Sequence, residues 1–226
     1  MSMQSTELAW REIRILYNEL QDPFVIFPMQ SAIFSLSEAL SQVELSFVEQ
    51  MGLCGVARKF WDVQTEILHE EKGIIIGNAF VLAQVVVAQT VGIFIRIRRH
   101  CKNCTLPGKK ETVLQFESEI ALHGSLSEVM VIESVANYFK HQHEWPEDWE
   151  EKAATPLQAK TLRSVKDIGM TPGDLTENME IALRDLRIRN DLPSILHKVQ
   201  SWRERLANRL SFEPEIVNSV LKYNFV

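Results

Sequence analysis

Apolar side chains recur every three or four residues along most of the chain, which is the spacing of one face of an α-helix. One long stripe comprises Met29, Ile33, Leu36, Leu40, Val43 and Phe47. A second, more apolar stripe comprises Ile75, Ala79, Leu82, Val86, Gln89, Ile93 and Ile97. We therefore predict an all-α protein, a helical bundle built around two long antiparallel helices.

The same spacing predicts shorter helices on both sides of the two long ones. They are an opening helix over 6–20, a short helix that carries Val56, Phe60, Val63 and Ile67, a helix over 112–122, a helix from Ser125 or Ser127 to His141, and C-terminal helices over 176–188, 195–210 and 214–221. The short helix is predicted to end near Gly73, because glycine commonly follows the last residue of a helix. The segment 24–27 is the best strand candidate, but it is short and prolines flank it.

The acidic, proline-containing stretch from Glu144 to Pro156 interrupts the helical pattern. We place a boundary there. Residues 1–145 are predicted to form the helical bundle, and residues 146–226 a C-terminal helical subdomain that packs on it.

The composition is that of a globular protein with its own core. The 226 residues are 46% hydrophobic and 24% charged, which excludes disordered, collagen-like and disulfide-scaffold classes. The net charge of −6 argues against binding nucleic acid over the whole surface. However, no acidic residue lies between Lys72 and Lys110. Arg96, Arg98 and Arg99 in this stretch are candidate phosphate-binding residues, and a solvated basic face is the alternative.

The apolar stretch 74–97 is either a buried core helix or a membrane segment, because its length fits both. Polar residues interrupt it at Asn78, Gln84, Gln89 and Thr90, and we therefore favour the core helix. The first eight residues lack the basic and apolar regions of a signal peptide. Three cysteines cannot all pair within one chain, so we expect a cytoplasmic protein with reduced thiols.

Cys101 and Cys104, preceded by His100, have the spacing of half of a zinc site. No second Cys-x-x-Cys pair occurs in the sequence, and Cys54 is distant along the chain. Thiol–disulfide exchange between Cys101 and Cys104 is a further alternative. We predict no metal and no cofactor.

The segment 133–141 carries the most suggestive group of polar residues. Glu133, Asn137 and His141 are spaced by four, so they share one face of a helix, and Lys140 borders that face. A carboxylate, an amide, an ammonium and an imidazole together can bind phosphate and move protons. We take these four as candidate catalytic residues. The alternative is that Asn137 and His141 satisfy backbone groups at a helix end, where cationic side chains are also favourable.

Asn137-x-x-Lys140-His141 at the end of a helix, in an all-helical chain with two long core helices, resembles the HEPN superfamily. Members of that superfamily are small helical bundles, often dimeric, and many are metal-independent ribonucleases of toxin–antitoxin, abortive-infection and CRISPR-linked systems. Their motif is an arginine, frequently followed by asparagine, and a histidine four to seven residues after the arginine. His141 and Asn137 match, but Ala136 stands before Asn137 and the arginine is absent. The resemblance implies that His141 aids activation of a ribose 2′-hydroxyl, and we expect Lys140 to contact the phosphate.

Trp145 and Trp149 lie in the acidic stretch that follows. Tryptophan is a common interface anchor, so both are candidate partner-binding residues. The alternative is that both rings fold back on the bundle as a lid.

Two functions remain open. The first is an RNA-directed defence or toxin-type protein, an endoribonuclease included. The second is a non-catalytic interaction module of immunity or antitoxin type, whose acidic loop contacts a basic partner. The predicted partners are RNA or another protein. A homodimer is a further alternative, because two such helix faces can form one cleft.

Overall fold

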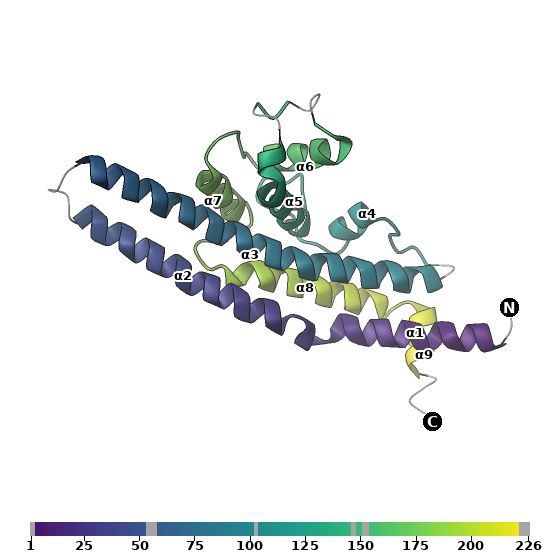
Figure 1. Cartoon of the computed structure of the whole chain (residues 1–226). Coiled ribbons are helices and arrows are strands. Elements are labelled where there is room, and N and C mark those ends of the chain that lie inside the picture. Colours follow the sequence, from purple (N-terminus) through teal and green to yellow (C-terminus); the bar gives the residue numbers. More distant parts are fainter. Residues whose placement is uncertain (1–2, 53–57, 102–103, 146–147, 151–153, 222–226) are drawn as a thin grey trace.

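The computed structural model describes residues 3–52, 58–101, 104–145, 148–150 and 154–221 (Figure 1). The regular structure in these residues is helical, apart from an isolated antiparallel bridge between Ile120 and Ser127. The predicted all-α fold is confirmed. The helices are α1 (Met3–Gln21), the 3-10 helix η1 (Pro23–Val25), α2 (Phe27–Gly52), α3 (Arg58–His100), α4 (Lys110–Gln115), α5 (Glu128–His141), the 3-10 helix η2 (Gln142–Glu144), α6 (Pro156–Asp167), α7 (Leu175–Asp185), α8 (Pro193–Leu210) and α9 (Pro214–Leu221).

The two predicted long helices are α2 and α3, which lie side by side and run antiparallel (Figure 1). α1 lies nearly end to end with α2 and packs against the C-terminal half of α3 (Figure 1). Between α1 and α2, the Asp22 carboxylate accepts a hydrogen bond from the Phe24 amide (2.9 Å) and caps η1. Phe24 and Val25 belong to η1, Ile26 forms a turn and Phe27 begins α2, so the segment 24–27 contains no strand.

α3 is the centre of the bundle. Its 43 residues span about 65 Å at 1.5 Å per residue, and it contacts α1, α2, α4, α5, α7 and α8. Its fully buried residues include Ile76, Phe80, Ala83, Val87 and Phe94. A helix surrounded on several sides needs apolar residues on all of them, which explains the long apolar run.

The same helix is the candidate membrane segment. Val63–His100 is long and apolar enough to cross a membrane, with a mean hydropathy of 1.9 in its most apolar window, and 61% of that window is buried. A core helix of a bundle has these properties as well, so hydropathy alone does not decide between the two alternatives.

The prediction that a helix ends at Gly73 is wrong, because α3 continues through this residue from Arg58 to His100. Gly73 is required for close packing. A Cβ atom there would stand 2.5 Å from the Thr176 Oγ1 atom and 3.1 Å from the Thr176 Cα atom of α7. One turn later, a Cβ atom on Gly77 would stand 2.1 Å from the Phe139 ring of α5. The absence of a side chain at Gly73 and Gly77 thus lets α7 and α5 pack closely against α3.

Two further helix predictions need correction. The helix expected over 112–122 is the shorter α4, which stops at Gln115. Glu117 then adopts a positive φ of 56° and the chain forms the Ile120–Ser127 bridge. α6 was not predicted, although it begins with a complete capping box between Thr155 and Gln158.

Side chains of the C-terminal segment belong to the same core as the rest of the protein. Trp202 of α8 is fully buried, and its indole N–H donates to the Phe116 carbonyl (2.9 Å). The continuous buried cluster extends from Ile13 to Ile216. The division at residue 145 stays a prediction.

Candidate functional site

α5 positions the four candidate catalytic residues, and its start is fixed by Ser127. The Ser127 hydroxyl accepts a hydrogen bond from the Met130 amide (3.2 Å) and donates one to the Leu114 carbonyl (2.7 Å). The predicted cap is therefore confirmed. Lys140 and His141 occupy the last turn of α5.

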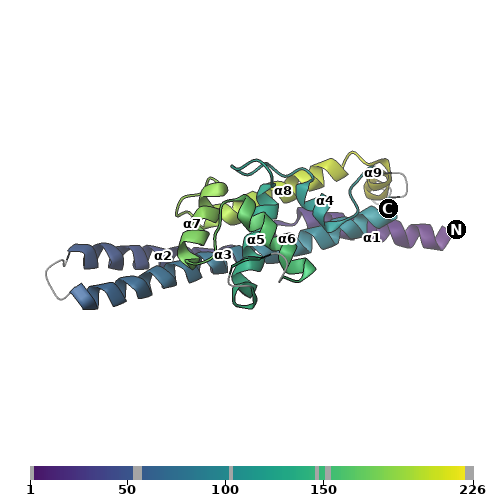
Figure 2. The same cartoon turned by 90° about the horizontal axis from the view of Figure 1, so that it is seen from above.

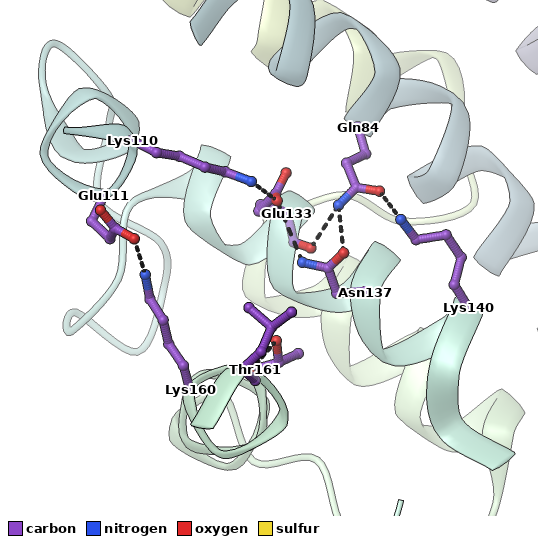
Figure 3. Close-up of polar contacts among 9 residues, drawn as sticks. Gln84, Lys110, Glu111, Glu133, Asn137, Lys140, Lys160 and Thr161 are labelled. Carbon is purple, nitrogen blue, oxygen red and sulfur yellow. Dashed lines mark hydrogen bonds and ion pairs between the residues drawn. The ribbon is translucent and has the colours of Figure 1, made fainter. Parts of the chain in front are cut away.

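Gln84 of α3 joins three of the four candidates into one network (Figure 3). Its amide nitrogen donates to Asn137 Oδ1 (2.8 Å) and to the Glu133 backbone carbonyl (3.3 Å). Its amide oxygen accepts from Lys140 Nζ (2.7 Å). Gln84 is buried, so these hydrogen bonds satisfy a polar side chain that would otherwise be costly to bury. The network therefore fastens α5 to α3.

Glu133 lies on the inner side of this network and is only 7% exposed. Its Oε1 atom pairs with Lys110 Nζ and accepts a weak hydrogen bond from the Asn137 amide (3.4 Å). Its Oε2 atom is buried and has no hydrogen-bond partner among the described residues. Removing Lys110 would leave this buried charge uncompensated, which makes the pair a structural one.

His141 stands outside the network. Its side chain is 49% exposed, and Nδ1 lies 3.3 Å from a carboxylate oxygen of Glu144. Among the described contacts, none joins His141 to Glu133, Asn137 or Lys140. The structure thus brings together three of the predicted four and leaves the imidazole, the group that would move a proton, at the exposed end of the helix.

A small polar cleft adjoins the network between α4, α5 and α6. Its volume is about 100 Å³, and its lining includes Lys110, Glu133, Asn137, Lys160 and Thr161 (Figure 3). Cavities that hold drug-sized ligands measure about 300–1,000 Å³. At about 100 Å³, the cleft is smaller than such cavities.

One ion pair closes a side of the cleft. Lys160 Nζ lies 2.7 Å from a Glu111 carboxylate oxygen. The hydrogen bond from Lys160 lowers the pKa of Glu111 below its ordinary value.

Trp145 and Trp149 are both buried and form a three-ring cluster with Tyr138 of α5. The ring centroids are 5.1 Å apart for Tyr138–Trp145 and 5.5 Å apart for the two tryptophans, in edge-to-face geometry. Burial raises the pKa of Tyr138 above its ordinary value, although its hydroxyl accepts a hydrogen bond from Asn178 (3.1 Å). The rings fold back on the bundle, so a partner that contacts them must first displace them.

The three arginines predicted to bind phosphate lie at the C-terminal end of α3. Arg96 pairs with Glu12 (3.1 Å), and Arg98 donates to the backbone carbonyls of Leu106 (2.9 Å) and Cys101 (3.2 Å). Arg98 therefore holds the chain that follows the C-terminal end of α3 against that helix. Arg96 is 12 residues beyond Gln84 in the sequence, which is about 18 Å along the helix axis. The structure separates these arginines from the α5 candidates.

The half zinc site of the sequence has other contacts in the structure. Cys101 is buried, the Cys104 thiol donates to the Cys101 carbonyl (3.2 Å), and no disulfide joins the two cysteines. His100 lies 3.3 Å from a Glu12 carboxylate oxygen. No group of three or more His, Cys, Asp or Glu suited to a metal ion occurs within the described ranges, and Cys54 lies outside them.

Sequence reasoning did not include three members of the site: Gln84, Lys110 and Lys160. A polar residue within the apolar run of α3 is the signal that points to Gln84. Nothing in the sequence places Lys110 or Lys160 beside Glu133, because both approach through tertiary packing.

A second surface feature was not predicted. The paired ends of α2 and α3 project beyond the other helices (Figures 1 and 2). We call residues 38–49 and 63–72 the α2–α3 arm. Four of its aliphatic side chains are at least half exposed: Leu45 (56%), Val48 (68%), Val63 (56%) and Ile67 (57%).

A groove of about 490 Å³ lies at the base of the arm. Apolar residues Val43, Phe47, Val48 and Leu68 line it, and polar residues Glu44, His69, Lys72, Glu180 and Asn190 complete it. Lys72 bridges the carboxylates of Glu180 (2.6 Å) and Glu44 (3.6 Å). The groove is therefore apolar within and charged at its border.

Comparison with protein-family models, with curated proteins and with solved structures finds no match to this chain. The resemblance to the HEPN superfamily stays a prediction.

Proposed function

We propose that this protein is a non-catalytic interaction module, and that the α2–α3 arm binds a basic amphipathic helix of another protein. The observation that carries the proposal is the pair of exposed aliphatic faces on the projecting arm. Contiguous exposed apolar surface on a globular protein is typical of interaction sites.

The charge of the arm selects the partner. Exposed glutamates border the aliphatic faces, and they are Glu38, Glu49, Glu66, Glu70 and Glu71. Lys72, the cation within the arm, is occupied by Glu44 and Glu180. A helix with lysine or arginine beside an apolar stripe complements this surface in both respects, because opposite charges steer and align the two surfaces.

We expect the groove at the base of the arm to contribute most of the binding free energy of such a helix. Helix-in-groove recognition places apolar residues of positions i, i+3, i+4 and i+7 into a hydrophobic channel. The aliphatic wall of the groove receives the apolar stripe, and the exposed glutamates of the arm attract the lysines beside that stripe.

The direct test uses a labelled peptide of about four turns, with leucine at positions i, i+3, i+4 and i+7 and lysine elsewhere, and fluorescence anisotropy. The arm variant combines Leu45→Ser with Val48→Ser. The matched control is Leu157→Ser, which removes an even more exposed aliphatic side chain (76%) from α6. We expect at least tenfold weaker binding to the arm variant and unchanged binding to the control.

Two comparison peptides complete the design. One replaces every lysine with glutamate, and the other scrambles the sequence to remove the apolar stripe; both should bind at least tenfold more weakly. Equal affinity for all three peptides overturns the proposal. Self-association of the wild type that the arm variant loses in sedimentation identifies a second copy as the occupant, which also overturns it.

An RNA-acting protein of defence or toxin type is a second candidate. Three ammonium groups favour it, since Lys110, Lys140 and Lys160 all lie near Asn137. They would contact RNA phosphates after leaving Glu133, Gln84 and Glu111. The test is cleavage of single-stranded RNA in the presence of a chelator, comparing the wild type with His141→Ala. Cleavage that this substitution abolishes supports the second candidate, and absence of cleavage by the wild type removes its catalytic form.

A further inference from the structure

A buried aspartate holds a partly exposed histidine at the C-terminal end of α7. Asp185 is fully buried, and its Oδ1 atom accepts a hydrogen bond from the His123 backbone amide (3.0 Å). The same oxygen lies 2.5 Å from His123 Nδ1. The Leu122 amide donates to the Asp185 carbonyl (2.9 Å), which fixes the loop against the helix.

This arrangement determines what the imidazole offers. Because Nδ1 faces the carboxylate, Nε2 is the nitrogen left for another molecule, and the His123 side chain is 45% exposed. A carboxylate at Nδ1 fixes the orientation of the ring. None of the four candidate catalytic residues takes part in this pair.

The end of α7 also carries arginines without partners. Arg184, Arg187 and Arg189 are exposed, and they form no ion pair with the residues that the structure describes. Arg184 precedes Asp185 directly, and Arg187 follows it by two residues, so their backbones lie at the same corner as His123. We call His123, Arg184, Asp185 and Arg187 the α7 corner.

Arg187 has a backbone conformation that favours glycine. Its φ is 57°, and its amide donates to the Arg184 carbonyl (2.9 Å) while the Ile188 amide donates to the Leu183 carbonyl (2.8 Å). These two hydrogen bonds define a Schellman motif, whose left-handed position is usually glycine. A side chain retained at such a position is a reason to look for function.

We propose that the α7 corner binds a phosphate group, with His123 Nε2 and the guanidinium groups of Arg187 and Arg184 as its contacts. Guanidinium groups match phosphate oxygens in geometry and charge, and an imidazole fixed by a carboxylate adds a directed donor. The ligand is a free phosphate or a phosphodiester. This proposal is independent of the arm and of the α5 network.

The test follows the imidazole signals of the protein by NMR at fixed pH. One titration uses inorganic phosphate, and the other uses a short oligouridylate without terminal phosphates. Sodium chloride at matched ionic strength is the control. We expect a saturable shift of the His123 signals with at least one of the two ligands. Saturation by both ligands identifies a general phosphate site. Saturation by one alone shows whether the site takes a free phosphate or a phosphodiester.

Arg187→Gly separates binding from folding. Glycine accepts the left-handed conformation, so this variant should keep or raise the Tm while its affinity falls at least tenfold. Arg11→Ala, which removes an exposed arginine of α1, should bind like the wild type, and Arg184→Ala is the second binding variant. No shift beyond the chloride control, or full affinity in both Arg187→Gly and Arg184→Ala, overturns the proposal.

Discussion

Thr176 of α7 lies so close to Gly73 of α3 that a Cβ atom on the glycine would stand 2.5 Å from the threonine hydroxyl oxygen. The same hydroxyl donates to the His69 carbonyl of α3. The contact therefore joins a side chain of α7 to the backbone of α3.

This contact predicts opposite effects of one substitution at two places on α3. Gly73→Ala should lower the free energy of unfolding by about 1–3 kcal/mol, because the added methyl group meets the Thr176 backbone. Gly92→Ala should raise it by roughly 0.5–1 kcal/mol, since nothing lies within 4 Å of the position where its Cβ would be. Urea denaturation of both variants measures the difference, and equal effects at the two positions would contradict the packing described.

Asp174 predicts an acid-sensitive contribution to stability. Burial alone would raise its pKa, but hydrogen bonds from the Glu177 amide (2.9 Å) and His69 (2.7 Å) lower it below its ordinary value. A lowered pKa in the folded state stabilises the protein above the unfolded value of about 3.9, and this stability is lost as the pH falls through the folded value.

Because the side chain is 42% exposed, we expect a loss of less than about 1 kcal/mol. The measurement is the difference in unfolding free energy between the wild type and Asp174→Asn at pH 6 and pH 3. Asparagine also caps helices, so the difference should shrink at pH 3. A difference independent of pH would refute the assignment.

The aromatic cluster predicts that Trp149 is structural. Trp149→Ala should lower the free energy of unfolding by about 3 kcal/mol, the range for a buried tryptophan. It should also reduce the near-ultraviolet circular dichroism that neighbouring rings generate. An unchanged unfolding midpoint would mean that the rings are not packed on Tyr138 and would restore them as partner anchors.

Gln84 and His141 should respond differently to removal. Gln84→Met leaves Asn137 and Lys140 without their shared partner and should cost about 1–3 kcal/mol. His141→Ala should change stability by less than about 0.5 kcal/mol, because the side chain is exposed. Thermal unfolding of both variants checks this. A larger loss in His141→Ala would place the imidazole inside the network.

Local signals in the sequence predicted the helices that depend on local chemistry. Ser127 caps α5 as expected, and the predicted stripes of α2 and α3 are buried or half-buried apart from Gln89, which is exposed. Gly73 does not end a helix, because its small size lets α7 cross α3, and nothing in the local sequence distinguishes this use of glycine from a helix end. Asp185 and His123 are 62 residues apart, and no pattern in the sequence joins them.

In the candidate site as well, the sequence predicted local helix geometry and not the contacts between helices. Spacing by four placed Glu133 and Asn137 on one face of α5 correctly. It could not show that Gln84 fills the space between Asn137 and Lys140, because that contact depends on how α3 and α5 cross. The exposed arm was also missed, since helical spacing of aliphatic residues does not distinguish a covered face from an open one.

The most direct test of the central claim is hydrogen exchange of the protein with and without the basic amphipathic peptide. We predict slower exchange of backbone amides in residues 38–49 and 63–72, and no change in α5 or α6. Slower exchange confined to the cleft between α4, α5 and α6, or no change at a saturating peptide concentration, would contradict the claim that the arm is the binding surface.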